Sequence, residues 1–157
     1  MLLMRRFAAL VRKILLRAKW RRHARRQGGL RLKISGVQKF LSRLDGVGIH
    51  YVVLRWPEEV PIDEESERNC PHDIDLLADF EHLDELSEIA ASQHGTFDVD
   101  LYNISGRKGA NYLRMPYFPP VFACEILNSR ARHRNGFFVS DPKMYFWSFA
   151  YHLVYHK

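Results

Sequence analysis

Hydrophobic residues recur along residues 2–26 at the three- and four-residue spacing of an α-helix. They form one stripe with basic residues around it, and the stripe consists of Leu3, Phe7, Leu10, Val11, Ile14, Leu15 and Ala18. Gly28 and Gly29 end the pattern. A basic amphipathic helix suits an anionic membrane surface, nucleic acid or a partner protein. We rank the membrane surface, contacted through residues 1–27, ahead of nucleic acid.

From residue 35 onward the pattern changes repeatedly between helix and strand. Helices with one apolar inner face are predicted over residues 35–44 and 82–93, and strands rich in apolar residues over residues 50–56, 72–80 and 97–103. An acidic loop with three prolines fills residues 57–71. This order predicts an α/β (α+β) fold, a mixed β-sheet flanked by helices, with function at strand ends and in loops.

The C-terminal part of the chain is rich in aromatic residues. A loop over residues 104–120 leads to two predicted short strands, at residues 121–127 and 137–139. Asp141 and Pro142 are a typical N-cap and first residue of a helix, which we expect to begin at Lys143. Its apolar face continues without a capping signal, so we expect either the N-terminal module of a longer polypeptide or a helix that docks on a partner.

The net charge of +6 averages two unlike regions. Residues 1–33 hold twelve Lys and Arg residues and no acid, whereas the remainder holds twelve basic and eighteen acidic residues. We assign residues 1–33 to a basic helix and linker and residues 34–157 to a single domain, because the length suits one hydrophobic core. No apolar stretch is long enough to span a membrane.

Two cysteines, Cys70 and Cys124, lack the spacing of a zinc site. So few cysteines suit a reducing compartment better than a disulfide framework. A single disulfide between Cys70 and Cys124 is the alternative that the sequence leaves open. We therefore expect a cytoplasmic protein, located at the inner face of the membrane if the basic helix binds there.

Two predicted strands carry aspartates at alternating positions. Asp73 and Asp75 lie in His72-Asp73-Ile74-Asp75-Leu76-Leu77, and Asp100 lies in Phe97-Asp98-Val99-Asp100-Leu101. Side chains two residues apart in a strand share a face and lie roughly 6.5–7 Å apart along it. Neighbouring carboxylates repel one another, and a divalent cation is the simplest reason to keep them together. Magnesium prefers such oxygen ligands and completes its shell with water and phosphate.

The order of these segments resembles the nucleotidyltransferase superfamily, in particular its poorly characterised bacterial branch. The resemblance rests on Tyr51-Val52-Val53-Leu54-Arg55-Trp56, Asp73-Ile74-Asp75-Leu76-Leu77 and Val99-Asp100-Leu101. The tail, with Ser140-Asp141-Pro142 and Tyr151-His152-Leu153-Val154-Tyr155-His156-Lys157, also resembles the end of such modules. The whole resemblance covers about residues 35–157 and does not include the basic helix.

The resemblance implies a Mg²⁺-dependent transferase that moves a nucleotidyl group from a nucleoside triphosphate to a small acceptor, such as a sugar in bacterial surface-polysaccharide metabolism. Asp73, Asp75 and Asp100 would be its catalytic residues and would hold one or two Mg²⁺ ions. Asp100 would complete the metal site or deprotonate the acceptor. Arg55 and Lys108 would contact phosphate.

The chain departs from the superfamily after its first matching strand. A Gly-Ser or Gly-Gly turn usually lets the backbone approach the triphosphate there, whereas this chain has Leu54-Arg55-Trp56-Pro57. This departure supports an alternative, a catalytically degenerate module that binds a nucleotide or a protein partner. His152 and His156 have a spacing that can bind zinc, but packing of the aromatic helix or a domain contact is the favoured role.

Overall fold

The computed structural model describes residues 6–8, 10–15, 18, 30–79, 83–105 and 115–157. Within these residues six strands form one mixed sheet in the order β1-β4-β3-β2-β6-β5. The strands are β1 (Leu30–Ile34), β2 (His50–Val53), β3 (Ile74–Asp79), β4 (Phe97–Asn103), β5 (Ala131–Arg132) and β6 (Phe138–Val139). Strand β3 runs parallel to β4, and β2 runs parallel to β6, whereas the other neighbouring pairs are antiparallel.

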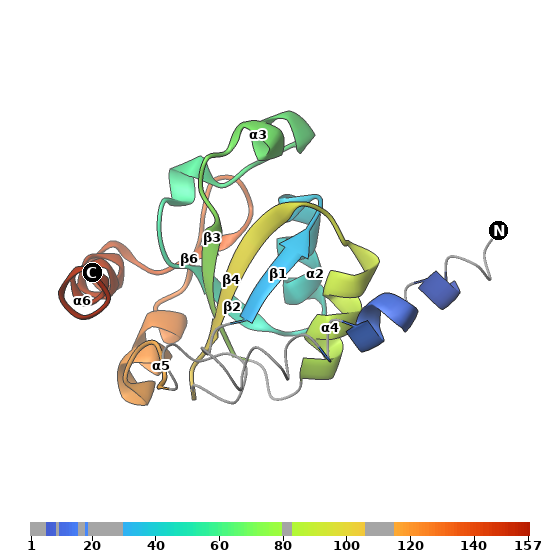
Figure 1. Ribbon diagram of the computed structural model, residues 1–157. Coiled ribbons are helices and arrows are strands. Elements are labelled where there is room, and N and C mark those ends of the chain that lie inside the picture. The colour runs from blue at the N-terminus through green and yellow to red at the C-terminus, as the bar shows by residue number, and fades with distance from the viewer. Residues whose placement is uncertain (1–5, 9, 16–17, 19–29, 80–82, 106–114) are drawn as a thin grey trace.

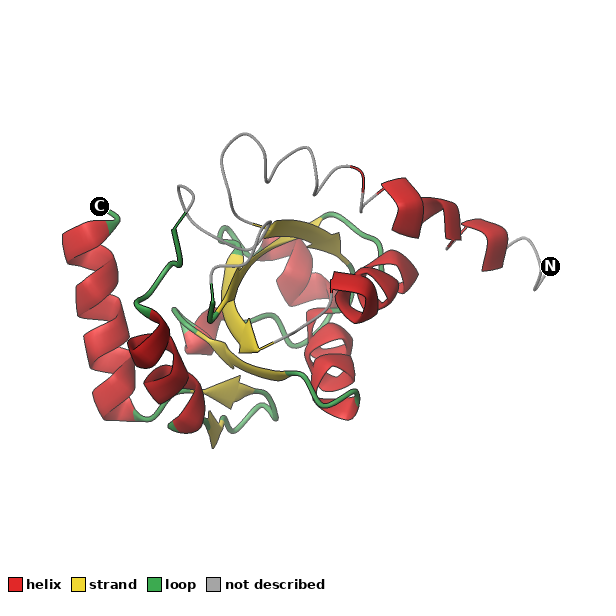
Figure 2. Cartoon of the chain, turned by 90° about the horizontal axis from the view of Figure 1, so that it is seen from below, coloured by secondary structure: helices red, strands yellow, loops and turns green. Residues whose placement is uncertain are grey.

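Helices cover both faces of the sheet (Figures 1 and 2). The helices α2 (Val37–Gly46) and α4 (Leu83–Ser92) contribute to the larger hydrophobic cluster on one face. The helices α5 (Pro120–Asn128) and α6 (Pro142–Tyr155) pack on the other face, over a second cluster that includes residues of β2, β3 and β4. The mixed α/β architecture predicted from the sequence is therefore present.

Strand β3 is buried on both faces because helices lie on each side of the sheet. Leu76 and Ala78 belong to the larger cluster, whereas Leu77 belongs to the second cluster, as expected from the alternation of side chains along a strand. Such a strand reads as a continuous apolar run. Asp75 interrupts the run while remaining buried, so it occupies a position where an apolar residue would otherwise pack.

Most elements predicted from the sequence are confirmed within a few residues. The strand at 97–103 has the predicted bounds, and α6 begins at Pro142 with Asp141 accepting a hydrogen bond from Met144 N. The strand predicted at residues 121–127 is wrong, because Pro120–Asn128 is the helix α5. The strand β1 was not predicted: the sequence alone placed its residues largely in a linker, whereas they pair with β4 along five positions.

The acidic segment between β2 and β3 contains two short helices, η1 (Pro57–Glu59) and α3 (Glu64–Asn69). Near the N-terminus, residues 6–8, 10–15 and 18 are helical, as predicted, and the rest of the range 2–26 lies outside the described residues. No helix in the described part of the chain is both long enough and apolar enough to cross a membrane. Cys70 and Cys124 are both free thiols, so the structure contains no bridge between them.

Candidate functional site: an aspartate cluster closed by two arginines

The pairing of β3 with β4 brings the three predicted aspartates to one place. Asp75 and Asp100 are direct partners in the parallel register, and Asp73 lies two residues before Asp75. Leu77 lies two residues after Asp75, and Tyr102 lies two residues after Asp100. Both pack under α5 and α6. Because side chains two residues apart in a strand share a face, Asp75 and Asp100 lie on this same face of the sheet. The three carboxyl groups therefore lie on the same side of the sheet.

Arg31 of the edge strand β1 bonds two of these carboxylates. It is the register partner of Asp100, and its Nε donates to Oδ1 of Asp100 at 2.6 Å. Its Nη2 donates to Oδ2 of Asp73 at 2.6 Å and to Oδ2 of Asp100 at 2.5 Å. The hydrogen bond to Asp100 raises the pKa of Arg31, and the charges of nearby aspartates act in the same direction. The Arg31 side chain is still 47% exposed, so it has room to move.

Arg55, just beyond β2, bonds the third carboxylate in a much more buried setting. Its side chain is 12% exposed and that of Asp75 is 7% exposed. Arg55 Nε donates to Oδ2 of Asp75 at 3.0 Å, and Nη1 donates to the hydroxyl of Tyr117 at 2.7 Å. Nη1 also lies 2.6 Å from Nδ1 of His152 on α6. Arg55 is therefore held by Asp75 on one side and by Tyr117 and His152 on the other. Arg31 is more exposed and, among the described residues, bonds carboxylates.

Burial sets the protonation behaviour of this inner group. Loss of hydration raises the pKa of Asp75, and the charge and hydrogen bond of Arg55 oppose that effect only in part. Burial, together with the positive charge of Arg55, lowers the pKa of His152 to about 4. A neutral His152 can accept the Arg55 hydrogen bond at Nδ1, so the network is consistent with these pKa shifts.

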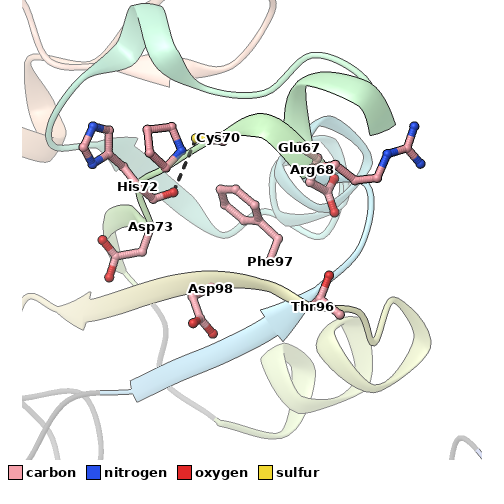
Figure 3. Close-up of a pocket in the computed structure, with 9 residues that line it drawn as sticks. Glu67, Arg68, Cys70, His72, Asp73, Thr96, Phe97 and Asp98 are labelled. Atoms are coloured by element: carbon pink, nitrogen blue, oxygen red, sulfur yellow. Dashed lines mark hydrogen bonds between the residues drawn. The ribbon is translucent and has the colours of Figure 1, made fainter.

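A cavity of about 540 Å³ opens beside Asp73, next to the first residues of β3 and β4 (Figure 3). Asp73 and His72 line it on one side, and Asp98 and Thr96 of the neighbouring chain segment line it on another. Its volume suits a small-molecule ligand. Its lining is mostly polar and mixes both signs of charge, which suits a hydrophilic ligand rather than a lipid.

Mg²⁺ suits the chemistry of this donor set but not its arrangement in this structure. Carboxylate oxygens are the ligands that Mg²⁺ prefers. Among the described residues, however, no three His, Cys, Asp or Glu side chains are placed so that they could hold a metal ion. Arg31 and Arg55 also bond all three aspartates in this structure. A metal ion could use these aspartates only after Arg31, the exposed arginine, has left them.

The other predicted site residues have different outcomes. Arg55 lies at the site, although its partner here is a carboxylate rather than a phosphate, and Lys108 lies outside the described residues. His156 Nε2 lies 2.9 Å from the carbonyl oxygen of Tyr117, so this histidine takes part in packing α6, as favoured above. Arg31 was missed, although the alternating sequence Leu30-Arg31-Leu32-Lys33-Ile34 carries the signal of a strand.

Trp56, directly after Arg55, has a backbone conformation that is typical of glycine. Its φ of 50° and ψ of 50° lie in the left-handed region, and it is the one non-glycine residue with positive φ among those that the structure describes. Its ring makes an edge contact with Phe149 of α6, with the centroids 5.6 Å apart. A left-handed residue therefore follows Arg55, although the sequence has no glycine there.

Comparisons of the chain with protein-family models, curated proteins and solved structures found no match. The functional argument therefore rests on the residues of the site themselves.

Proposed function

We propose that this domain is a nucleotidyltransferase-like enzyme that transfers a nucleotidyl group from a nucleoside triphosphate to a small hydrophilic acceptor, with Mg²⁺ as its cofactor. The observation that supports it most is the register of β3 and β4, which sets Asp75 beside Asp100 with Asp73 two residues away. Asp75 is buried within the apolar part of β3, a costly position that a purely structural role would rarely need.

The charge of the site favours a metal complex over a bare nucleotide. Three carboxylates and two guanidinium groups leave one net negative charge when all five are ionised. A free triphosphate would be repelled by these carboxylates, whereas a bound cation reverses the interaction. When bound, Mg²⁺ would neutralise charge on the phosphates and stabilise the attacking and leaving oxygens.

The chain's own residues would then divide the work. Asp73, Asp75 and Asp100 would be the metal ligands, and Arg55 would keep Asp75 in a fixed orientation through its second anchor on Tyr117. Arg31, released from Asp73 and Asp100, would be free to contact a phosphate oxygen. The cavity beside Asp73 would receive the acceptor, whose hydroxyl would donate its proton to a nearby carboxylate. The acceptor oxygen would then be bonded to the α-phosphorus, and pyrophosphate would leave.

Calorimetry with each of ATP, CTP, GTP and UTP, with and without Mg²⁺, tests this proposal. We expect wild-type protein to bind at least one nucleotide only when the metal is present. Asp100→Asn should weaken that binding by about tenfold or more, because it removes a metal ligand. Asp79→Asn is the matched control: this exposed aspartate lies at the far end of β3, outside the cluster and the cavity, so the variant should bind like the wild type.

A second candidate, a degenerate binding module, is favoured by the specific observation that arginines already occupy the aspartates. The variant Arg31→Gln helps to separate the enzyme from the degenerate module. The electron paramagnetic resonance signal of Mn²⁺ measures metal binding by the variant and by the wild type. A wild type that binds Mn²⁺ and nucleotide and also releases pyrophosphate on turnover supports the enzyme proposal, whereas one that binds both without turnover is a degenerate binding module. If only Arg31→Gln binds Mn²⁺, Arg31 is a permanent substitute for the metal and the degenerate module is the better description. If neither binds, the metal site itself is refuted.

A further inference from the structure

The N-terminal helix keeps its apolar stripe in solvent after the domain has folded. Phe7 is 68% exposed and Ile14 is 57% exposed, and Leu10, Val11 and Leu15 are exposed as well. These residues recur at helical spacing on one side of the described helix. Single exposed apolar residues are common, but a contiguous stripe marks an interaction surface.

The domain contacts the adjacent side of this helix, and Leu10 lies at the border between that side and the stripe. Arg6, Leu10 and Lys13 line a cavity together with residues of α2 and α4, and Lys13 Nζ lies 3.2 Å from Oε2 of Glu88. At 100° per residue, Lys13 lies about a third of a turn from the line through Phe7 and Ile14. The apolar stripe therefore faces sideways from the domain, where a large flat partner could reach it.

We propose that this helix holds the protein on an anionic lipid surface, with the stripe around Phe7, Val11 and Ile14 inserted among the lipid head groups. Residues 1–33 contain twelve Lys and Arg residues, and the first acidic residue of the chain is Asp45. Basic residues beside an apolar stripe attract anionic lipid while the stripe partitions into the interface. The basic charge and the exposed apolar stripe thus both favour an anionic lipid surface as the partner of this helix.

Nucleic acid would use the basic residues but not the stripe. Phosphate contacts require Lys and Arg and leave a row of aliphatic and aromatic side chains without a role. A second exposed apolar surface, on α5 and α6, lies at the opposite end of the molecule from the N-terminal helix (Figures 1 and 2). That separation makes it possible to test the two surfaces independently.

The test measures co-sedimentation of the full chain with vesicles of phosphatidylcholine, with and without phosphatidylglycerol, at low and high salt. We expect binding to the anionic vesicles, weakened by salt. The double variant Phe7→Gln/Ile14→Gln keeps the net charge, yet it should lower the partition coefficient by about tenfold or more, because two apolar side chains no longer enter the interface.

Val121→Gln/Val154→Gln is the matched control, because it removes two exposed apolar side chains from α5 and α6. It should bind vesicles like the wild type. Equal loss in both double variants, or no binding by the wild type, would overturn the proposal. So would tighter binding to a DNA duplex than to vesicles with no effect of the Phe7 and Ile14 changes, because that result would identify a nucleic-acid arm. Circular dichroism confirms that each variant is folded.

Discussion

Trp56 adopts a backbone conformation that L-residues rarely adopt. We therefore expect a glycine variant at this position to be more stable than an alanine variant. A left-handed conformation costs a residue with a Cβ atom about 1 kcal/mol or more, and glycine avoids that cost. Both Trp56→Gly and Trp56→Ala lose the contact with Phe149, so their difference isolates the backbone effect. We expect Trp56→Gly to be more stable than Trp56→Ala by about 1 kcal/mol in urea unfolding.

The reverse order, with the alanine variant more stable, would show that residue 56 is free to leave the left-handed region. The same pair also bears on function. If the proposed nucleotide site exists, Trp56→Gly should bind the metal–nucleotide complex more tightly than Trp56→Ala, because only glycine lets the backbone keep this turn without strain. Calorimetry on the two variants measures that difference.

The aspartates could be predicted from the sequence because alternation in a strand fixes which side chains share a face. Asp75 and Asp100 needed only the assumption that their strands are neighbours in the sheet, and β3 and β4 are. Arg31 could not be found by the same reasoning. It lies near the end of a strongly basic segment, and its role depends on β1 pairing with β4 across about seventy residues of chain. Local pattern says nothing about such a long-range pairing.

At the scale of elements, the carboxylate of Glu67 connects α3 to the N-terminus of α2 through hydrogen bonds. The first residues of α2 have no side-chain cap of their own, since Gly36 occupies the N-cap position. Glu67 of α3 supplies the missing acceptor: its Oε2 receives the backbone N–H of Gly36 at 2.9 Å and of Val37 at 3.2 Å. The negative charge at this helix N-terminus is also favourable with respect to the helix dipole.

Glu67→Ala should therefore lower the free energy of unfolding by about 1–2 kcal/mol, the usual cost of losing an N-terminal cap. Glu65→Ala, an exposed change in the same helix, is the control and should cost much less. Urea unfolding of the two variants measures both values. Equal effects would mean that α3 contributes through its own helicity rather than through its contact with α2. Because Glu67 lines the cavity beside Asp73, we also expect Glu67→Ala to weaken ligand binding there.

The helix α5 shows where element prediction from sequence is weakest. Its apolar run reads equally well as a buried strand or a buried helix, because a short segment covered by other elements does not show a clear period. Two prolines, Pro119 and Pro120, favour a helix start, since proline fits the first turn of a helix. The position of the segment between the sheet and α6 decides the outcome, and that position is a property of the tertiary structure.

At the scale of the whole molecule, one buried network joins α6 to the sheet. Asp75 on β3, Arg55 after β2, and Tyr117 with His152 form a chain of polar contacts through the second hydrophobic cluster. Groups in such a network must all be satisfied, because an unpaired buried charge is costly. Protonation of His152 would place a positive charge against Arg55, so the packing of α6 should depend on pH.

The sign of that dependence follows from the pKa of His152, which is about 4 in the folded protein against an ordinary value of 6.5. Between pH 6.5 and about pH 4 the unfolded chain binds a proton that the folded protein does not bind. The free energy of unfolding should therefore fall as pH falls through this window, and His152 should contribute nothing further below it. His156, whose pKa is also lowered by burial, acts in the same direction.

Urea unfolding at intervals from pH 7.5 to pH 4 tests this for the wild type, His152→Asn and His152→Gln. Both variants remove the titrating ring, and the asparagine amide can still accept a hydrogen bond near the position of Nδ1. We expect both to be less stable than the wild type at neutral pH, and both to lose part of its slope below pH 6.5. A slope unchanged in either variant would exclude His152 as a source of the pH dependence. An effect at neutral pH alone would assign it a packing role only.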